Sequence, residues 1–123
     1  MSNSLNPTWS DPVTKKDIRC YILINNKLPT IHGGIQAAHS LAELMVKFPQ
    51  GIVSDWATNH KTLVFLSATE DEIRLMCDYF EQKSRLQAKF SEPDLDYLLT
   101  AAAFEPMEAS EGKILFGKFK LFN

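Results

Sequence analysis

The chain has 123 residues, of which 45% are hydrophobic and 23% are charged, and its formal net charge is −2. This length suits a single domain with its own core, and the composition is that of a globular protein, which excludes a disordered chain. The apolar runs are too short to cross a bilayer, and the polar segment Met1–Thr14 does not have the pattern of a secretory signal. We therefore expect a cytoplasmic protein without membrane partners. The weak negative charge argues against nonspecific coating of nucleic acid.

The first half of the chain predicts an arm, a strand and a helix. Residues 1–16 are rich in Ser, Asn, Pro and Asp and predict a flexible arm, from which Trp9 could dock on a single domain over 17–123. The nearly continuous apolar segment 19–25 predicts a central strand that is buried on both faces. A helix should follow over about 33–48. Its expected core stripe is Ile35, Ala38, Ala42, Met45 and Val46.

The middle of the chain repeats this order. The segment 50–60 is compatible with a short helix, and 61–67 predicts a second strand. Thr69 followed by Glu72 forms a capping box, which predicts a helix that begins there and ends near Ser84. Because a helix separates the first two strands, these strands should be parallel.

The last part of the chain completes the predicted sheet. Segments 86–90 and 98–104 predict two further strands joined by an acidic loop over 91–96, and 113–122 predicts a last strand or short helix. Strands alternating with helices favour an α/β fold. We expect one domain built as a three-layer sandwich, with a small mixed β-sheet flanked by helices.

The cysteines and histidines do not form a recognisable metal site. Cys20 lies in a predicted strand and Cys77 in a predicted helix, which favours buried thiols. His32 and His39 are seven residues apart, without a third ligand at a recognisable spacing. We expect neither a metal nor a cofactor.

Polar side chains gather around the start of the first predicted helix. Gln36, His39 and Glu43 recur at steps of three and four residues and so lie along one stripe, while Lys27 and His32 stand in the loop before it. The carboxyl ends of parallel strands and the starts of helices are places where ligands, phosphates included, bind. For a single residue, a satisfied polar edge of the helix is the simpler interpretation. The whole cluster favours an accessible site shared with an acidic side chain of the loop 92–96.

The spacing of these residues resembles that of type 2 peptidyl-tRNA hydrolases. The family pattern after the first strand is Lys, three residues, Gly-Lys, three residues, Gln, two residues and His. Lys27, Gln36 and His39 stand at these spacings, and Ile31-His32 replaces the Gly-Lys pair.

The resemblance covers nearly all of residues 19–121. The loop around Glu92 and Asp94 looks like a shortened version of the family's loop with a conserved Asp, and Thr100 corresponds to the family's Thr at the start of the next strand. A plain turn at 92–94 and a simple strand-forming role for Thr100 are the alternatives.

The resemblance implies hydrolysis of the ester between a peptide, or an N-blocked amino acid, and tRNA. An imidazole would be the general base, a carboxylate would orient it, and the amide, hydroxyl and ammonium groups would hold the substrate. The expected catalytic residues are His32, His39, Glu92 and Asp94, and the expected substrate-binding residues are Lys27, Gln36 and Thr100.

Two other classes of function stay open. One is a catalytically silent module of the same fold that recognises RNA, a nucleotide or a protein partner, and the other is an enzyme acting on a small molecule in the same crevice. The partners to test are therefore tRNA or another nucleotide-containing ligand, and a second copy of the chain. The His at position 32 favours the silent module, whereas Gln36, His39 and the acidic loop favour the hydrolase.

Overall fold

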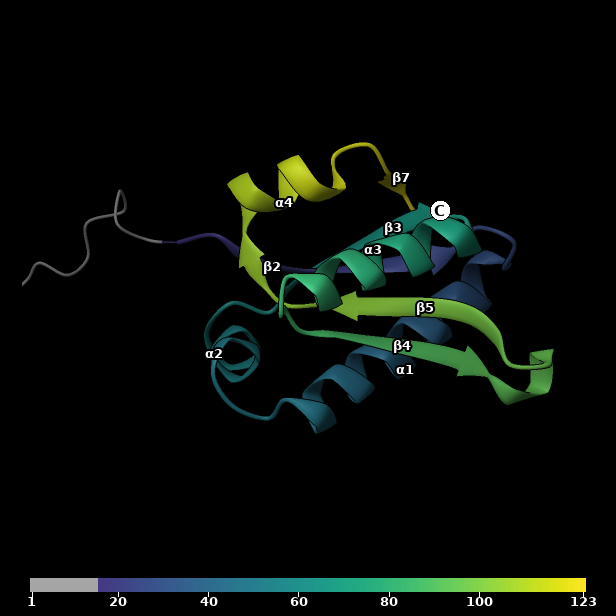
Figure 1. Cartoon of the computed structure of the whole chain (residues 1–123), viewed down its shortest axis with the longest axis horizontal. Coiled ribbons are helices and arrows are strands. Elements are labelled where there is room, and N and C mark those ends of the chain that lie inside the picture. Colours follow the sequence, from purple (N-terminus) through teal and green to yellow (C-terminus); the bar gives the residue numbers. More distant parts are fainter. Residues whose placement is uncertain (1–15) are drawn as a thin grey trace, which may run out of the picture.

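The computed structural model describes residues 16–123, so the predicted arm, with Trp9, lies outside the described residues except for Lys16. Both helices and strands form along this part of the chain (Figure 1). In chain order they are β2 (Ile18–Asn25), α1 (Thr30–Lys47), α2 (Ile52–Asn59), β3 (Thr62–Ala68), α3 (Glu70–Gln82), β4 (Gln87–Glu92), the 3-10 turn η2 (Pro93–Leu95), β5 (Leu98–Phe104), β6 (Met107–Glu108), α4 (Ala109–Phe116) and β7 (Lys120–Leu121).

The strands form one mixed six-stranded sheet in the order β4-β5-β2-β3-β7, and β6 pairs with the beginning of β2. β2 and β3 are parallel, as predicted, with Arg19 opposite Thr62 and Asn25 opposite Ala68. β5 is antiparallel to both β2 and β4, so β4 runs in the direction of β2. The carboxyl ends of β2, β3 and β4 consequently lie at one edge of the sheet, here called the carboxyl edge.

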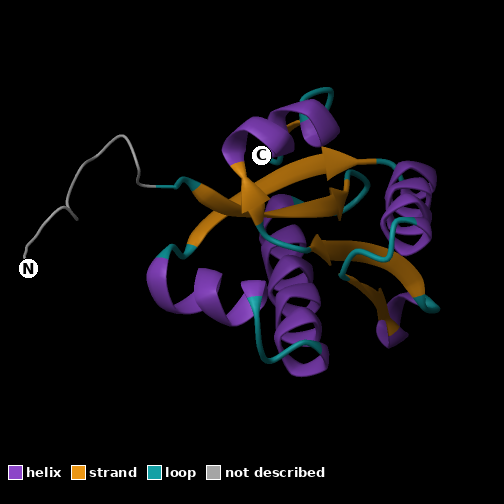
Figure 2. Cartoon of the chain, turned by 60° about the vertical axis from the view of Figure 1, so that its left-hand side comes forward, coloured by secondary structure: helices purple, strands orange, loops and turns teal. Residues whose placement is uncertain are grey.

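Helices cover both faces of this sheet, which confirms the predicted α/β sandwich (Figure 2). α1 and α2 pack on one face and α3 and α4 on the other. The central strand β2 supplies both layers of the core, because successive side chains of a strand point to opposite faces. Ile22 and Ile24 belong to the cluster under α1, and Tyr21 and Leu23 to the cluster under α3 and α4.

The capping box and the two buried thiols are confirmed. Thr69 N donates to the Glu72 carboxylate at 2.9 Å, and Glu72 N donates to Thr69 Oγ1 at 3.1 Å, so α3 begins where the sequence predicts. Cys20 and Cys77 lie in the core. Burial raises the pKa of each thiol to about 12, which leaves them protonated and unreactive at neutral pH.

The start of α1 differs from the prediction. The helix begins at Thr30, directly after Pro29, so His32 lies in the first helical turn and not in the preceding loop. Gly33 and Gly34 both lie within the helix, as the predicted range 33–48 requires. At Gly33 a Cβ atom would overlap the ring of Phe122, so this glycine allows the C-terminal segment to pack against the helix.

The predicted core stripe of α1 is wrong, because the helix turns a different face to the sheet. Ile35 is 49% exposed and Val46 is 77% exposed, and Ala38, Ala42 and Met45 are exposed as well. The buried residues are Gly33, Gln36, Ala37, Ser40 and Leu44. Small side chains on this face meet the alanines of β5, which lets the helix lie close to the sheet.

The predicted element at 113–122 is two elements. α4 starts earlier, at Ala109, and ends at Phe116, and the short strand β7 then pairs with β3. The short helix at 50–60 is present as α2, and Trp56 packs in the core with its indole N–H donating to the carbonyl of Thr62. None of the helices within residues 16–123 is long and apolar enough to span a membrane.

Candidate functional site

The candidate site includes a bulge in β5, opposite the end of β4. Phe90 of β4 stands opposite Ala101, but the next residue, Ser91, stands opposite Leu99, so Thr100 is an extra residue without a partner in the ladder. Such a bulge re-aims a side chain that regular alternation would send to the other face. The Thr100 side chain points toward α1 as a result, and its hydroxyl contacts Gln36.

Gln36 joins Thr100 to Glu92. The Thr100 hydroxyl donates to Oε1 of Gln36 at 2.6 Å and lies 3.2 Å from the carbonyl oxygen of Phe90. The amide nitrogen of Gln36 donates to Glu92 Oε1 at 2.8 Å. Thr100 is completely buried and Gln36 is 5% exposed, which contradicts the expectation that Gln36 is accessible. A buried amide satisfied on both sides fixes the direction of its hydrogen bonds.

The Glu92 carboxylate is therefore held in one place at the end of β4. Its second oxygen accepts a hydrogen bond from the backbone N–H of Asp94 at 3.4 Å. The hydrogen bond from Gln36 lowers the pKa of Glu92, with smaller contributions from the Asp94 N–H and from the charge of His39. Glu92 is therefore an ionised carboxylate in a fixed position at neutral pH. Its side chain is half-buried, whereas Gln36 and Thr100 are buried.

His39 completes the arrangement one helical turn after Gln36. Its imidazole stacks on the ring of Phe90, with 4.5 Å between ring centroids and 15° between planes. Phe90 and Glu92 are two residues apart on β4 and face α1, where they meet His39 and Gln36 respectively. His39 is exposed. The structure thus brings four of the seven expected site residues together: Gln36, His39, Glu92 and Thr100.

Asn25 is a part of this framework that the sequence did not reveal. It is buried at the end of β2, where its side-chain N–H donates to the carbonyl of Leu99, beside the bulge, and its Oδ1 accepts from the N–H of Lys27. Both distances are 3.0 Å. Asn25 therefore ties the loop before α1 to the bulge of β5. The signal was an amide directly at the end of an otherwise apolar strand, where a buried polar group needs partners.

The other expected site residues lie at the same carboxyl edge without joining the network. Lys27, His32 and Asp94 are exposed, and within residues 16–123 their side chains form neither a hydrogen bond nor an ion pair with another residue. The start of α1 carries no side-chain cap and no acidic residue in its first turn, so its first N–H groups are available to a ligand. In the described part of the chain, no three His, Cys, Asp or Glu side chains gather closely enough to hold a metal ion.

Comparisons with known proteins show the fold and no more. No family model matches the sequence, and no curated protein matches it. The structure is similar to that of Atu0240, a protein of unknown function from Agrobacterium tumefaciens, with a TM-score of 0.58 and 10% sequence identity. The similarity covers 87% of this chain and 98% of that protein.

Proposed function

We propose that this protein hydrolyses the ester that links a peptide, or an N-blocked amino acid, to tRNA. The observation that carries the proposal is the exposed imidazole of His39, stacked on Phe90 two residues before Glu92, whose carboxylate is held by the Gln36 amide. General-base hydrolysis uses such a pair, because a fixed carboxylate stabilises the imidazolium that forms. The substrate class comes from the sequence resemblance to type 2 peptidyl-tRNA hydrolases, and tRNA chemistry would take place in the cytoplasm.

In the proposed mechanism His39 is the general base. Its imidazole takes a proton from a water molecule as the water oxygen attacks the ester carbonyl carbon. The tetrahedral oxyanion then collapses, and the imidazolium returns the proton to the leaving ribose oxygen. The products are a carboxylic acid and tRNA with a free terminal hydroxyl. Gln36 and Thr100 are buried, so we assign them as positioning residues of Glu92 and not as groups that touch the substrate.

The start of α1 is the proposed binding place for the phosphate nearest the ester. Its free N–H groups and partial positive charge favour an anion, and Lys27 and His32 project from the same edge of the sheet. The backbone N–H of Lys27 donates to Oδ1 of Asn25, so the backbone of Lys27 is fixed although its side chain is exposed. Binding and chemistry would therefore use neighbouring but different groups.

The direct test is release of N-acetylphenylalanine from N-acetylphenylalanyl-tRNA. The wild-type protein should release it above the uncatalysed background, and Glu92→Gln should reduce the rate by roughly tenfold or more, because the imidazolium loses its carboxylate. Asp94→Asn is the matched control, since it removes the same charge two residues away and leaves the backbone N–H that Glu92 uses. Equal rates for the two variants would contradict the assignment of Glu92.

A catalytically silent binding module is the second candidate. Two observations favour it: His32 stands where the resemblance expects Lys, and burial of Gln36 leaves fewer accessible polar groups than expected. A wild-type protein that binds tRNA but releases no N-acetylphenylalanine would select this function. Sedimentation of the same sample would show whether a second copy of the chain is a partner.

A further inference from the structure

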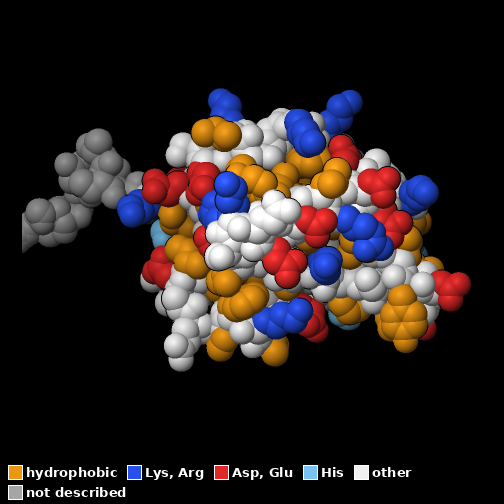
Figure 3. Space-filling view, viewed as in Figure 1, with side chains coloured by type: hydrophobic (Ala, Val, Ile, Leu, Met, Phe, Trp, Pro, Cys, Tyr) orange, Lys and Arg blue, Asp and Glu red, His pale blue; other side chains and the backbone are white. Residues whose placement is uncertain are grey.

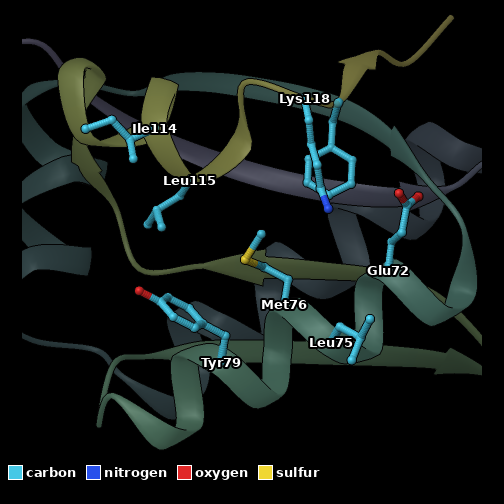
Figure 4. A pocket seen from close by; sticks show the side chains of 8 residues that line it. Glu72, Leu75, Met76, Tyr79, Ile114, Leu115 and Lys118 are labelled. Carbon is cyan, nitrogen blue, oxygen red and sulfur yellow. The ribbon is translucent and has the colours of Figure 1, made fainter.

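A groove between α3 and α4 lies on the face of the sheet opposite the candidate site. Its cavity measures about 350 Å³, which is within the usual range of about 300 to 1,000 Å³ for ligand pockets. The walls are mostly apolar, and Figure 4 shows side chains of the two helices facing each other across the space. The apolar lining residues are Leu75, Met76, Tyr79, Ile114, Leu115 and Phe119.

The rims of this groove leave large apolar side chains in water. Leu75 is 69% exposed and Ile114 is 84% exposed, and Tyr79 is 40% exposed. Leu75 and Tyr79 are four residues apart and so lie on one face of α3. Figure 3 shows hydrophobic side chains on this face, with both basic and acidic side chains around them. Contact with an apolar ligand would remove part of this surface from water.

The groove contains one positively charged side chain, that of Lys118. The Lys118 side chain reaches from the segment after α4 toward α3, and its ammonium lies 5.1 Å from the centroid of the Phe119 ring (Figure 4). Lys118 forms no ion pair with any carboxylate of residues 16–123. Glu72, on the opposite wall, is used by the capping box, where one oxygen accepts the N–H of Thr69. The ammonium is therefore available to an anion.

The polar end of the groove continues into a second cavity of about 370 Å³. The two cavities share Glu72, Lys118 and Phe119, and the second is lined in addition by Lys120, Ser67 and Asn26. An apolar trough thus leads directly to a polar, lysine-bearing end. A ligand that matches both parts has an apolar body and an anionic head.

We propose that the α3–α4 groove binds a small amphiphilic monoanion, an apolar chain or ring that carries one carboxylate. The body would lie between Leu75 and Ile114, and the carboxylate would pair with Lys118. A single negative charge fits better than a phosphate dianion, because the Glu72 carboxylate lies at the same end and repels additional charge. This binding site is separate from the ester hydrolysis proposed above.

Octanoate, octanamide and octylamine are the probes, since they share one chain and differ in head group. Their binding is measured by ¹H–¹⁵N chemical-shift titration of the full chain. Octanoate should bind with a dissociation constant of about a millimolar, as expected for so few atoms. It should bind roughly two- to fivefold more tightly than octanamide, because the ion pair with Lys118 is partly exposed. Octylamine should bind most weakly.

Two variants and one control locate the contacts. Lys118→Gln should abolish the preference for octanoate over octanamide while both probes still bind. Leu75→Glu should weaken the binding of both probes, and the fold should tolerate this substitution because Leu75 is largely exposed. Lys47→Gln, in the last turn of α1 on the opposite face, removes the same charge and should leave the preference unchanged. Equal affinity for the three head groups, no binding of octanoate, or shifts away from α3 and α4 would overturn the proposal.

Discussion

The hydroxyl of Thr100 donates to Oε1 of Gln36 at 2.6 Å, and this hydrogen bond links a bulge in β5 to the inner face of α1. Since the Gln36 oxygen accepts from Thr100, its nitrogen is directed outward, where it donates to Glu92. The Glu92 carboxylate can only accept, so it fixes which end of the Gln36 amide faces outward, and the Thr100 hydroxyl donates to the other end. Through this one residue, the fold of the sheet determines where the carboxylate of the candidate site lies.

Replacing Thr100 with Val should destabilise the fold by about 1 to 3 kcal/mol. Valine keeps the shape of the side chain but leaves the buried Oε1 of Gln36 without a donor, and an unsatisfied buried acceptor carries that cost. The free energy of unfolding from urea titration is the measurement. As a control, Gln36→Leu combined with Thr100→Val should cost less than the sum of the two single changes, because the shared hydrogen bond is lost only once. Additive costs would contradict the coupling.

The pKa of Glu92 should depend on the hydrogen bond that Gln36 donates to it. Gln36 lowers the pKa of this carboxyl below its ordinary value of 4.5, so the interaction stabilises the fold above that value and is lost as the pH falls toward the lowered pKa. In Gln36→Leu the pKa should rise toward 4.5. A ¹³C titration of the Glu92 carboxyl in both proteins measures the difference, and identical curves would show that Gln36 is not the cause.

The parallel pairing of β2 and β3 was predictable from the sequence, whereas the packing of α1 was not. The apolar run of β2, the capping box at Thr69 and the strand pattern of β3 each depend on local residues, and all three are confirmed. The sequence pattern predicted the wrong buried face of α1, because two faces of this helix could pack against the sheet. The more hydrophobic one contains Ile35 and Val46, but the sheet beneath offers small alanines and two polar partners, which fit the face of Gln36 instead.

The candidate site was predicted as a list of residues but not as a geometry. Helical spacing correctly grouped Gln36 with His39, and the acidic loop lies at the same edge of the sheet. The bulge at Thr100 has no signature in the strand pattern, because a bulge depends on pairing with a distant strand. Without it, Thr100 would not face α1. The buried role of Asn25 likewise depends on Leu99, seventy-four residues later.

The two neighbouring glycines of α1 should respond in opposite ways to alanine. At Gly34 a Cβ atom would meet open space, so Gly34→Ala should stabilise the helix by about 0.5 to 1 kcal/mol. At Gly33 the same atom would overlap the ring of Phe122, so Gly33→Ala should destabilise the fold by about 1 kcal/mol or more. Thermal unfolding measures both. Phe122→Leu should reduce the cost at Gly33, and a stabilising Gly33→Ala would contradict this packing.

The loop after η2 contains two strained residues whose relief should stabilise the protein. Asp96 and Tyr97 have φ angles of 58° and 60°, in the left-handed region that bulky side chains rarely adopt. Tyr97 is 70% exposed, so Tyr97→Gly removes few packing contacts. The substitution also keeps the backbone N–H that donates to the carbonyl oxygen of Glu92. It should stabilise the fold by about 0.5 to 1 kcal/mol, and Asp96→Gly by less, because Asp tolerates this conformation better. Urea titration that found Tyr97→Gly clearly destabilised would contradict this account.

His39→Phe should separate catalysis from structure at the proposed active site. Phenylalanine can still stack on Phe90, so the free energy of unfolding should change little, but the ring has no nitrogen to accept a proton. Release of N-acetylphenylalanine from its tRNA ester should fall by roughly a hundredfold or more, as expected when a general base is lost. His32→Ala should raise KM with little change in kcat, because His32 is assigned to phosphate binding at the start of α1. His60→Ala is the control and should change neither constant. A fully active His39→Phe protein would exclude His39 as the base, and a hundredfold loss in kcat for His32→Ala would assign that role to His32 instead.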